Sequence, residues 1–421
     1  MNTTEFDVIV VGGGASGLMA AGRAAERGKK VLLIEKNKKL GEKLKISGGG
    51  RCNITNAEFD DRALLKNYGK AEQFLYSAFS QFGVKETFSF FESKGLPLVV
   101  QARKRAFPHT ERALDVYAVL EKYIRAGKVT VKTGSAVTHI VSETTGAKAD
   151  RRKIISVVSA QHEYKARSFI FATGGVSHPE TGSTGDGFSW LLQLGHTVSK
   201  PTPTIVPLAV HEQWVKELAG VSLSFMKITF FVDGVKQFSE IGKILFTHFG
   251  ISGPLILNSA YKVSDLLHDG IVTSTIDAFP DTDLGSLERR ILAIFDKNKN
   301  KMLKNIFKDI APDGTSRSIL SLVKKFVDPA KKVHSVTNEE RKFIVRILKA
   351  LPLTITGLMG YDRAVIADGG VALGEIDMKT MRSKKIENLY VTGDLLHINR
   401  PSGGYSLQLC WTTGYVAGSH A

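Results

Sequence analysis

The chain has 421 residues, of which 43% are hydrophobic and 23% charged, and it carries a formal net charge of +16. This length predicts two or three domains, and the composition excludes a disordered or fibrous chain. The two cysteines, Cys52 and Cys410, lie far apart and outside any Cys-x-x-Cys pair. The sequence therefore argues against a disulfide framework, a zinc site or a dithiol redox centre, and we expect no bound metal.

The start of the chain lacks the pattern of a signal peptide. Acidic Glu5 and Asp7 come early, and the apolar run over residues 8–11 is too short for a signal sequence. No stretch approaches the roughly 18 apolar residues of a membrane span. These features favour a cytoplasmic protein without a membrane partner.

The predicted elements begin with a strand–helix–strand unit and continue as a mixed α/β domain. After the first unit, residues 37–57 have the turn chemistry of a loop. The β-rich runs between 129 and 171 resemble a small antiparallel meander that returns to the sheet. In chain order, the pattern predicts strands at 6–11 and 30–34 around a helix at 15–27, helices near 71–81, 84–93 and 111–126, strands at 129–132, 136–141, 154–160 and 168–171, and a loop followed by a helix at 182–194.

Beyond Pro201 the composition changes twice. Residues 207–276 are β-rich, 284–349 are helical and basic, and β signals return after Pro352. The chain then closes with a strand at 389–392, a glycine-rich loop and a last helix. We therefore expect a nucleotide-binding domain that is split by an insertion, with its first part at 1–200, a β-rich domain at 201–283, a basic helical insertion at 284–350 and its second part at 351–421.

The positive charge is concentrated in the helical insertion. Between Arg289 and Lys349 there are sixteen Lys or Arg and six Asp or Glu residues. Such a local excess favours a polyanionic partner, either a nucleic acid or an anionic surface. The alternative is a lysine-rich helical face that only keeps the protein soluble.

The segment Gly12-Gly13-Gly14-Ala15-Ser16-Gly17 predicts a dinucleotide site. It follows an apolar strand and opens a helix, and Glu35 ends the next strand 18 residues later. Gly12 permits a tight turn, Gly14 lets the backbone approach a pyrophosphate, and Gly17 allows close helix–strand packing. The helix N-terminus attracts the phosphates, and Glu35 is suited to accept hydrogen bonds from a ribose. A glycine-rich turn without a ligand is the alternative.

Three further segments favour FAD over NAD as the bound dinucleotide. Residues 169–175 form an apolar strand that ends in Ala-Thr-Gly, and residues 389–394 form a strand that ends in Asp394, a position suited to the ribityl hydroxyls. Residues 403–406 lead into the last helix, whose amides are expected to face the flavin. The chain has no second strand–GxGxxG–helix unit, so a separate NAD(P) domain is not expected. No covalent flavin attachment pattern is evident.

Several blocks resemble the aminoacetone-oxidase-like (BaiN/RdsA-type) family of bacterial NAD(P)/FAD-dependent oxidoreductases. The resemblance runs nearly end to end, and its most specific parts are residues 45–56 and 245–254; further blocks are 105–108, 172–187 and 369–371. It implies an α/β fold in which a Rossmann-like FAD-binding domain, three-layer ββα as in glutathione reductase, is interrupted by a β-barrel-like domain and a small helical domain. Asp394 stands where relatives often carry Glu, and the residues from His397 to Ser406 also depart from the usual pattern.

The resemblance implies a flavin enzyme, and its family includes amine oxidation, reduction of bile-acid enones and formation of dihydrouridine in ribosomal RNA. The last two reactions add a hydride to a C=C bond conjugated with a carbonyl. The basic insertion favours the RNA substrate, because phosphate contacts require distributed positive charge. The alternatives are a small-molecule enone reductase or amine oxidase, and a non-catalytic FAD-containing factor that binds RNA or the ribosome. NAD(P)H is the expected electron donor.

Residues expected to bind FAD lie at the ends of the predicted strands and in the glycine-rich loops. They are Gly12, Gly14, Ala15, Ser16, Gly17, Glu35, Lys36, Gly49, Gly50, Arg51, Cys52, Val137, Ala172, Thr173, Gly174, Gly393, Asp394, Gly403, Gly404, Tyr405 and Ser406. The lysines expected to contact RNA are Lys297, Lys299, Lys301, Lys304 and Lys308.

Cys52 and His248 are the candidate proton donors. Cys52 lies in the loop that the family places near the flavin, and the adjacent Arg51 is expected to depress its thiol pKa. The alternative for Cys52 is a small residue packed beneath the flavin, and the alternative for His248 is a structural role. For residues 103–105, His109 and Arg112 the sequence leaves two alternatives: contact with substrate phosphates, or a local structural role.

Overall fold

The computed structural model describes residues 5–145, 151–159 and 162–421, and it divides them into two compact units. One unit comprises residues 1–203 and 365–421, and the other comprises residues 204–364. Ala160, the last residue of one predicted strand, lies outside the described residues. Within them, no helix combines the length and the apolar character needed to cross a membrane.

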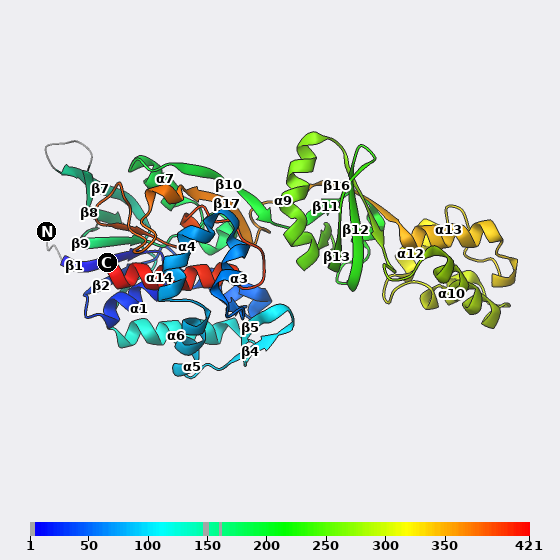
Figure 1. Cartoon of the computed structure of the whole chain (residues 1–421), viewed down its shortest axis with the longest axis horizontal. Helices are drawn as coiled ribbons and strands as arrows, with labels where there is room; N and C mark the ends of the chain where they lie inside the picture. Colours follow the sequence, from blue (N-terminus) through cyan, green and yellow to red (C-terminus); the bar gives the residue numbers. More distant parts are fainter. Residues whose placement is uncertain (1–4, 146–150, 160–161) are drawn as a thin grey trace. The chain divides into compact units, whose positions relative to one another are not determined.

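The first unit is built around a seven-stranded sheet that mixes parallel and antiparallel pairs (Figure 1). Its parallel part has β1 between β2 and β9, with β6 beside β2 and β18 beside β9, and β7, β8 and β9 form the antiparallel part. The strands are β1 (Glu5–Val11), β2 (Val31–Ile34), β6 (Thr130–Lys132), β7 (Val137–Thr145), β8 (Arg151–Ser159), β9 (His162–Phe171) and β18 (Leu389–Val391).

The predicted meander therefore starts one strand later than expected. The run at 129–132 is β6, which pairs in parallel with β2 at the edge of the sheet rather than with the meander. A parallel neighbour needs a crossover, and the helix that precedes β6 supplies it. The loop predicted at 37–57 also contains a short helix, α2 (Glu42–Ile46), and a 3₁₀ turn at Ser47–Gly50.

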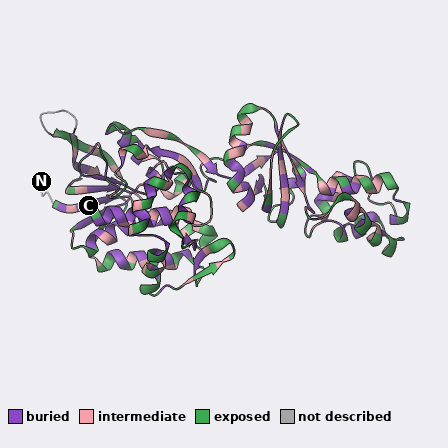
Figure 2. Ribbon diagram, in the orientation of Figure 1, coloured by how far each residue is buried: buried purple, intermediate pink, exposed green. Residues whose placement is uncertain are grey.

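Helices cover one face of this sheet, and α14 (Tyr405–His420) is central to that layer. Figure 2 shows that α14 is mostly buried, and its buried residues include the polar Gln408, Thr412 and Thr413, whose side chains are hydrogen-bonded. It packs against α1 (Ala15–Glu26) at short range. A Cβ on Gly414 would lie 2.4 Å from the Ser16 carbonyl oxygen, and one on Gly418 would lie 2.4 Å from that of Ala20. The two glycines therefore permit the close crossing of the helices.

The rest of the first unit consists of short helices and two small sheets. One sheet has the order β3–β5–β4, and the other pairs β10 with β17. The remaining elements are α3 (Asp61–Leu65), α4 (Glu72–Gln81), α5 (Val84–Ser93), α6 (Ala113–Ala126), α7 (Asp186–Gln193), β3 (Thr55–Asn56), β4 (Leu98–Gln101), β5 (Arg105–Pro108), β10 (Val198–Ile205) and β17 (Ile366–Val371).

The second unit is a closed β-barrel with an attached group of helices. The barrel order is β11–β14–β13–β12–β15–β16, with antiparallel pairing throughout. β16 (Leu351–Leu358) closes the barrel between β15 and β11, so this strand belongs to the barrel, whereas the sequence placed residues from 351 onwards in the FAD domain. The other strands are β11 (Leu208–Val210), β12 (Ser222–Val232), β13 (Val235–Thr247), β14 (Gly250–Ser252) and β15 (Val272–Asp277).

Two helices of this unit lie within the segment predicted as β-rich. They are the short α8 (Gln213–Lys216) and the longer α9 (Pro254–Asp269), which begins with proline at its first position and buries residues on one face. The basic segment forms several short helices, as predicted, and their apolar faces join the barrel side chains in one hydrophobic core. The helices of the basic segment are α10 (Leu284–Lys297), α11 (Leu303–Ile306), α12 (Ser316–Val323) and α13 (Asn338–Lys349).

Candidate functional site

The carboxyl ends of four parallel strands meet at one edge of the sheet. In register, Val11 of β1 lies beside Ile34 of β2 and Phe171 of β9, and Phe171 lies beside Val391 of β18. The segments that follow these strands contain the Gly12–Gly17 fingerprint, Glu35, the Ala172–Gly174 turn and the Gly393–Asp394 pair. The topology therefore gathers these predicted residues at the edge where doubly wound α/β sheets bind ligands.

The three fingerprint glycines have different surroundings. Gly12 has a φ of +105°, and a Cβ there would lie 2.5 Å from the Ala172 carbonyl oxygen. A Cβ on Gly17 would lie only 1.9 Å from the carbonyl oxygen of Gly12, so glycine is needed for the helix to approach the strand. Gly14 instead faces open space, with no atom within 4 Å of the position that a Cβ would take, and no side chain caps α1 there. The first amides of α1, from Ala15 onwards, are therefore suited to an anion.

Glu35 is 8% exposed and is held by two backbone amides. The Gly13 amide donates to its Oε2 atom at 2.7 Å, and the Asn37 amide donates to Oε1 at 2.8 Å. Each carboxylate oxygen keeps acceptor capacity for a further donor. The carboxylate borders a cavity that is lined by Val11, Gly12, Ile34, Glu35, Lys36, Ser135, Val137, Thr173, Gly182, Thr184, Asp186 and Trp190.

Five of the predicted residues line this cavity, and the turn after β9 adds residues that the sequence reasoning missed. Lys36 donates to Asp186 at 2.8 Å and also contacts the Thr184 hydroxyl, which ties the end of β2 to the start of α7. The block at 172–187 had drawn attention to this turn through the family resemblance. Nothing in the spacing of residues 182–190 alone signals a pocket wall.

The glycine-rich loop before Asn53 has an unusual backbone. Gly49 and Gly50 both have positive φ, and so does Cys52 at +59°. The Cys52 side chain is completely buried, and burial raises its thiol pKa to about 12 despite a hydrogen bond with Ser47. The predicted depression of this pKa by Arg51 is therefore wrong.

The direction of the Arg51 side chain explains the difference. Its guanidinium lies over the Phe107 ring at 4.3 Å and pairs with Glu111 at 3.1 Å. The positive charge is thereby partly neutralised by a carboxylate, and the thiol is governed by its own burial.

Asp394 belongs to a buried cluster of charges. Its carboxylate forms a short ion pair with Arg400, whose side chain is only 2% exposed. Burial raises the pKa of Asp394, but the charges of Arg400 and Lys43 outweigh it and hold that pKa below its usual value. Burial lowers the pKa of Lys43, which donates to Ser177 at 3.2 Å. Sequence reasoning missed Lys43, because a lysine in a loop carries no signal of burial.

The loop before α14 is fixed against β3. Gly404 has a φ of +104°, and a Cβ there would lie 2.2 Å from the Thr55 carbonyl carbon. The Ser406 hydroxyl accepts from Arg400 Nε at 3.1 Å, and the Tyr405 carbonyl accepts from Tyr68 at 2.9 Å. These contacts leave the N-terminus of α14 close to the Asp394–Arg400 pair.

His248 lies in the other unit, in the turn between β13 and β14. Its side chain is exposed, and its ring contacts that of Phe249 edge to face at 5.0 Å. Five exposed lysines of the basic segment, at positions 297, 299, 301, 304 and 308, lie in this second unit as well. Among the described residues, no group of three or more His, Cys, Asp or Glu side chains is arranged to hold a metal.

Residues 6–420 match the sequence profile described as the HI0933-like protein Rossmann domain. The chain belongs to this family. It is a flavin-dependent oxidoreductase with a Rossmann-type FAD-binding domain, as the sequence predicted. The observations at the sheet edge suit such a group: open space at Gly14, uncapped amides on α1 and a buried carboxylate at Glu35.

Members of the family with curated functions are similar to this chain over almost their whole length. A 3-dehydro-bile acid delta(4,6)-reductase of Clostridium scindens is 29% identical, with 98% of each chain covered. A ribosomal RNA dihydrouridine synthase of Escherichia coli is 28% identical, with 98% of this chain and 97% of the relative covered. The fold is also that of a solved 3-ketosteroid-delta4-(5alpha)-dehydrogenase of Rhodococcus jostii, at a TM-score of 0.54 and 15% identity over 99% of this chain and 96% of that one.

Proposed function

We propose that this flavin enzyme reduces the C5=C6 bond of a uridine in ribosomal RNA, in the cytoplasm and with NAD(P)H as electron donor. When bound, reduced FAD supplies the hydride for the β carbon of the conjugated carbonyl system. The protein binds the RNA, holds the base and provides a proton for the α carbon. The proposal rests on the positive surface of the second unit.

In this proposal the sheet edge holds FAD without a covalent bond. The uncapped amides at the start of α1 bind the pyrophosphate, and Gly14 leaves room for it. Glu35 accepts from the adenosine ribose, with Val137 and Thr173 in the same cavity wall. Asp394 accepts from the ribityl hydroxyls, and the loops at 49–52 and 403–406 border the flavin ring.

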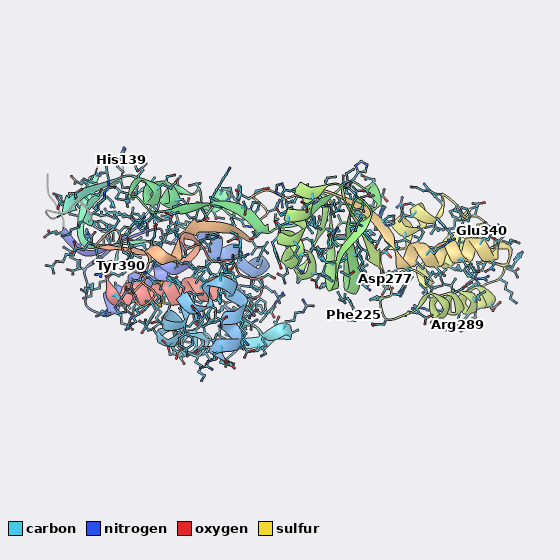
Figure 3. The ribbon with its side chains drawn as sticks, turned by 45° about the horizontal axis from the view of Figure 1, so that its top comes forward. His139, Phe225, Asp277, Arg289, Glu340 and Tyr390 are labelled. Atoms are coloured by element: carbon cyan, nitrogen blue, oxygen red, sulfur yellow. The ribbon has the colours of Figure 1, made fainter. Side chains whose placement is uncertain are left out.

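The single observation that carries the RNA assignment is the exposure of the basic segment. Thirteen of its sixteen Lys and Arg residues are exposed, including all five lysines predicted to contact RNA. Figure 3 labels Arg289 as an example, with Glu340 and Asp277 among the acids of the same unit. The three basic side chains that are not exposed form ion pairs: Lys331 with Glu340 at 2.9 Å, Arg341 with Glu288 at 3.0 Å and Lys349 with Asp277 at 2.6 Å.

The less exposed pairs and the exposed charges therefore have different roles. Three ion pairs anchor the helices. Among the exposed cations, Lys299 forms a long pair with Asp296 at 3.7 Å in which both side chains stay exposed, so the exposed set remains accessible to a polyanion. Backbone hydrogen bonds bring two basic loops together, because the Leu303 amide donates to the Lys331 carbonyl at 2.9 Å and the Val333 amide donates to that of Lys301 at 3.0 Å. Charge spread over many positions is the requirement for binding RNA by its phosphates.

Nucleoside mass spectrometry of ribosomal RNA from cells with and without this gene tests the proposal. Loss of one dihydrouridine on deletion, and its return on expression of the wild-type chain, is the expected result. An equal dihydrouridine content in ribosomal RNA from cells with and without the gene would reject the RNA substrate.

A small-molecule enone reductase is the second candidate, and the 29% identity to the bile acid reductase favours it. This alternative predicts NAD(P)H-dependent reduction of a steroid enone by the purified protein and no salt-dependent RNA binding. Both reactions add a hydride and a proton across a conjugated C=C bond, so the flavin chemistry itself does not distinguish them.

A further inference from the structure

Three arginines gather where the β4–β5 hairpin approaches the loop before α14. The hairpin tip contains Arg103 and Lys104, both in the left-handed region with φ of 60° and 55°. The Asn56 amide donates to the carbonyl oxygens of Arg103 and Gly403, each at 3.3 Å. This amide therefore fixes the hairpin tip beside the 403–406 loop.

The middle arginine, Arg105, has an unsatisfied donor. Its side chain is partly buried, and its Nε atom has no hydrogen-bond partner among the described residues. Gln101 lies directly opposite Arg105 in the hairpin and accepts from Arg51 at 3.4 Å, which brings Arg51 to the same part of the hairpin. Burial lowers the pKa of Arg105, and the charges of Arg103 and Arg51 lower it further. A buried charged donor without an acceptor is costly, and repulsion from two like charges adds to this cost.

Nearby acids do not cancel the positive charge. Glu111 forms an ion pair with Arg51 at 3.1 Å, and Glu58 forms one with Lys104. Even with Glu111 counted against it, the cluster of Arg51, Arg103 and Arg105 keeps a net positive charge. Non-glycine residues in the left-handed region also cost stability, and such strain is commonly retained at functional sites.

We propose that Arg51, Arg103 and Arg105 form an anion-binding site that takes one phosphodiester group of the RNA substrate. A guanidinium offers a planar fork of donors that matches phosphate oxygens, and Arg105 Nε supplies a donor that no described protein group satisfies. The nature of the anion rests on the proposed function. The site belongs to the FAD-binding unit, whereas the lysines of the basic segment belong to the other unit, and it positions a phosphate next to the base that is reduced.

The experiment measures binding of a fluorescently labelled ten-nucleotide oligouridylate to the holoenzyme by anisotropy. We expect Arg105→Gln to weaken binding about tenfold, as for loss of a charge-assisted hydrogen bond. Arg167→Gln is the matched control, because Arg167 belongs to the same unit, is 85% exposed and only weakly paired with Asp7 at 3.8 Å. We expect less than about a twofold change for this control, which removes the same charge.

A second oligonucleotide makes the test specific to phosphate. The same sequence with uncharged methylphosphonate linkages should bind the wild-type protein and the Arg105→Gln variant equally. Equal affinity of Arg105→Gln and Arg167→Gln for the natural oligonucleotide would overturn the proposal. So would a loss for Arg105→Gln that is the same with both oligonucleotides.

Two further measurements address a misfolded variant and a small anionic ligand. If Arg105→Gln fails to retain FAD or to fold, Arg103→Gln provides the test, because the Arg103 side chain is exposed. Cholate serves as a small carboxylate that competes with the oligouridylate. If Arg105→Gln abolishes this competition but leaves oligouridylate binding unchanged, the site binds a small carboxylate, and the proposal of a phosphodiester ligand is overturned. The proposed function is tested separately. It fails if deletion of the gene leaves the dihydrouridine content of ribosomal RNA unchanged, whatever affinities these experiments give.

Discussion

At the residue scale, Asp394 forms a buried ion pair and is also the residue proposed to contact the ribityl hydroxyls of FAD. Replacing it with alanine leaves the Arg400 guanidinium, only 2% exposed, without its partner. We expect Asp394→Ala to lower the free energy of unfolding of the apoprotein by about 3–5 kcal/mol, measured by urea denaturation, and to weaken FAD binding. Asp115→Ala is the control: its partner Arg112 is exposed and 4.0 Å away, so the loss should stay below about 1 kcal/mol. Equal losses in the two variants would contradict the role of the buried pair.

Cys52 is buried, which supports the packing alternative over the role of proton donor. Its side chain has no exposed surface, and its thiol pKa is raised to about 12 by burial. We therefore expect Cys52→Ala to keep FAD and to retain turnover within about twofold, because a cavity of this size affects stability rather than chemistry. Steady-state kinetics with the FAD content determined by absorbance checks this. A loss of turnover greater than about tenfold, with FAD retained, would restore Cys52 as the acid.

A histidine network in the first unit predicts how stability depends on pH. His196 contacts Glu375 through Nδ1 at 2.9 Å and Ser383 through Nε2 at 2.9 Å. This resembles a hydrolytic triad, but the Ser383 hydroxyl is buried and already accepts two backbone amides, from residues 385 and 386. The network therefore stabilises the fold rather than activating a nucleophile.

Acidification should destabilise the protein through both titratable members of this network. Burial lowers the pKa of His196, so the folded state binds fewer protons than the unfolded state, and stability falls as the pH drops below about 6.5. Burial raises the pKa of Glu375, but hydrogen bonds from Lys385 and Thr197 bring it to about 2, so a second loss occurs between about pH 4.5 and 2. Between pH 7 and 5, the unfolding temperature should fall less in His196→Gln than in the wild type. Equal falls in the two proteins would refute the role assigned to His196.

At the element scale, the sequence was most informative where spacing and turn chemistry agree. The strand–turn–helix around Gly12–Gly17 follows from its glycines, and the helices near 71–81 and 84–93 correspond to α4 and α5. The helix α9 was missed because the segments around it, which form β13 and β15, give residues 207–276 their β-rich composition. Its start at Pro254 after Gly253 is a helix signal that outweighs that composition.

Other features depend on contacts that no local pattern contains. The parallel partner of β6 is set by the crossover from β2, and the barrel closes where β16 pairs with β11, so that Leu358 lies opposite Leu208. The charge cluster around Asp394 likewise brings Lys43, from α2 near the start of the chain, to Asp394 and Arg400 near its end. Long-range pairing and burial of charge are properties of the assembled fold.

The start of α1 gives a paired prediction that separates cofactor binding from packing. At Gly14 a side chain would meet no protein atom, and the backbone is extended, so Gly14→Val should fold normally but fail to retain FAD. At Gly17 a Cβ would lie 1.9 Å from the Gly12 carbonyl oxygen, so Gly17→Ala should unfold at a lower temperature even as apoprotein. Differential scanning fluorimetry and FAD titration of the apoproteins measure the two effects. Undiminished FAD affinity in Gly14→Val would show that the pyrophosphate does not bind at this position.

At the scale of the whole molecule, the distribution of charge in the second unit supports the proposed RNA partner. Its exposed cations are spread over several helices and loops rather than gathered in one pocket, and three of its acids are used in ion pairs with the less exposed cations. A single small anion needs only two or three such donors, whereas RNA gains affinity with every phosphate contacted. The cofactor chemistry belongs to one unit, and the affinity for RNA is expected to come largely from the other.

The last prediction tests that division with a matched pair of multiple variants. Changing Lys297, Lys299, Lys301, Lys304 and Lys308 to glutamine removes five exposed charges from the second unit. FAD content and reduction by dithionite should be unchanged, while affinity for a ribosomal RNA fragment falls. The slope of log K against log salt should decrease by up to about 0.7–0.9 for each phosphate that the variant no longer neutralises. The control removes five exposed lysines from the first unit: Lys66, Lys70, Lys85, Lys122 and Lys132. The two variants carry the same net charge, so a general electrostatic attraction would lower both slopes equally, and that outcome would reject the basic segment as the RNA-binding surface.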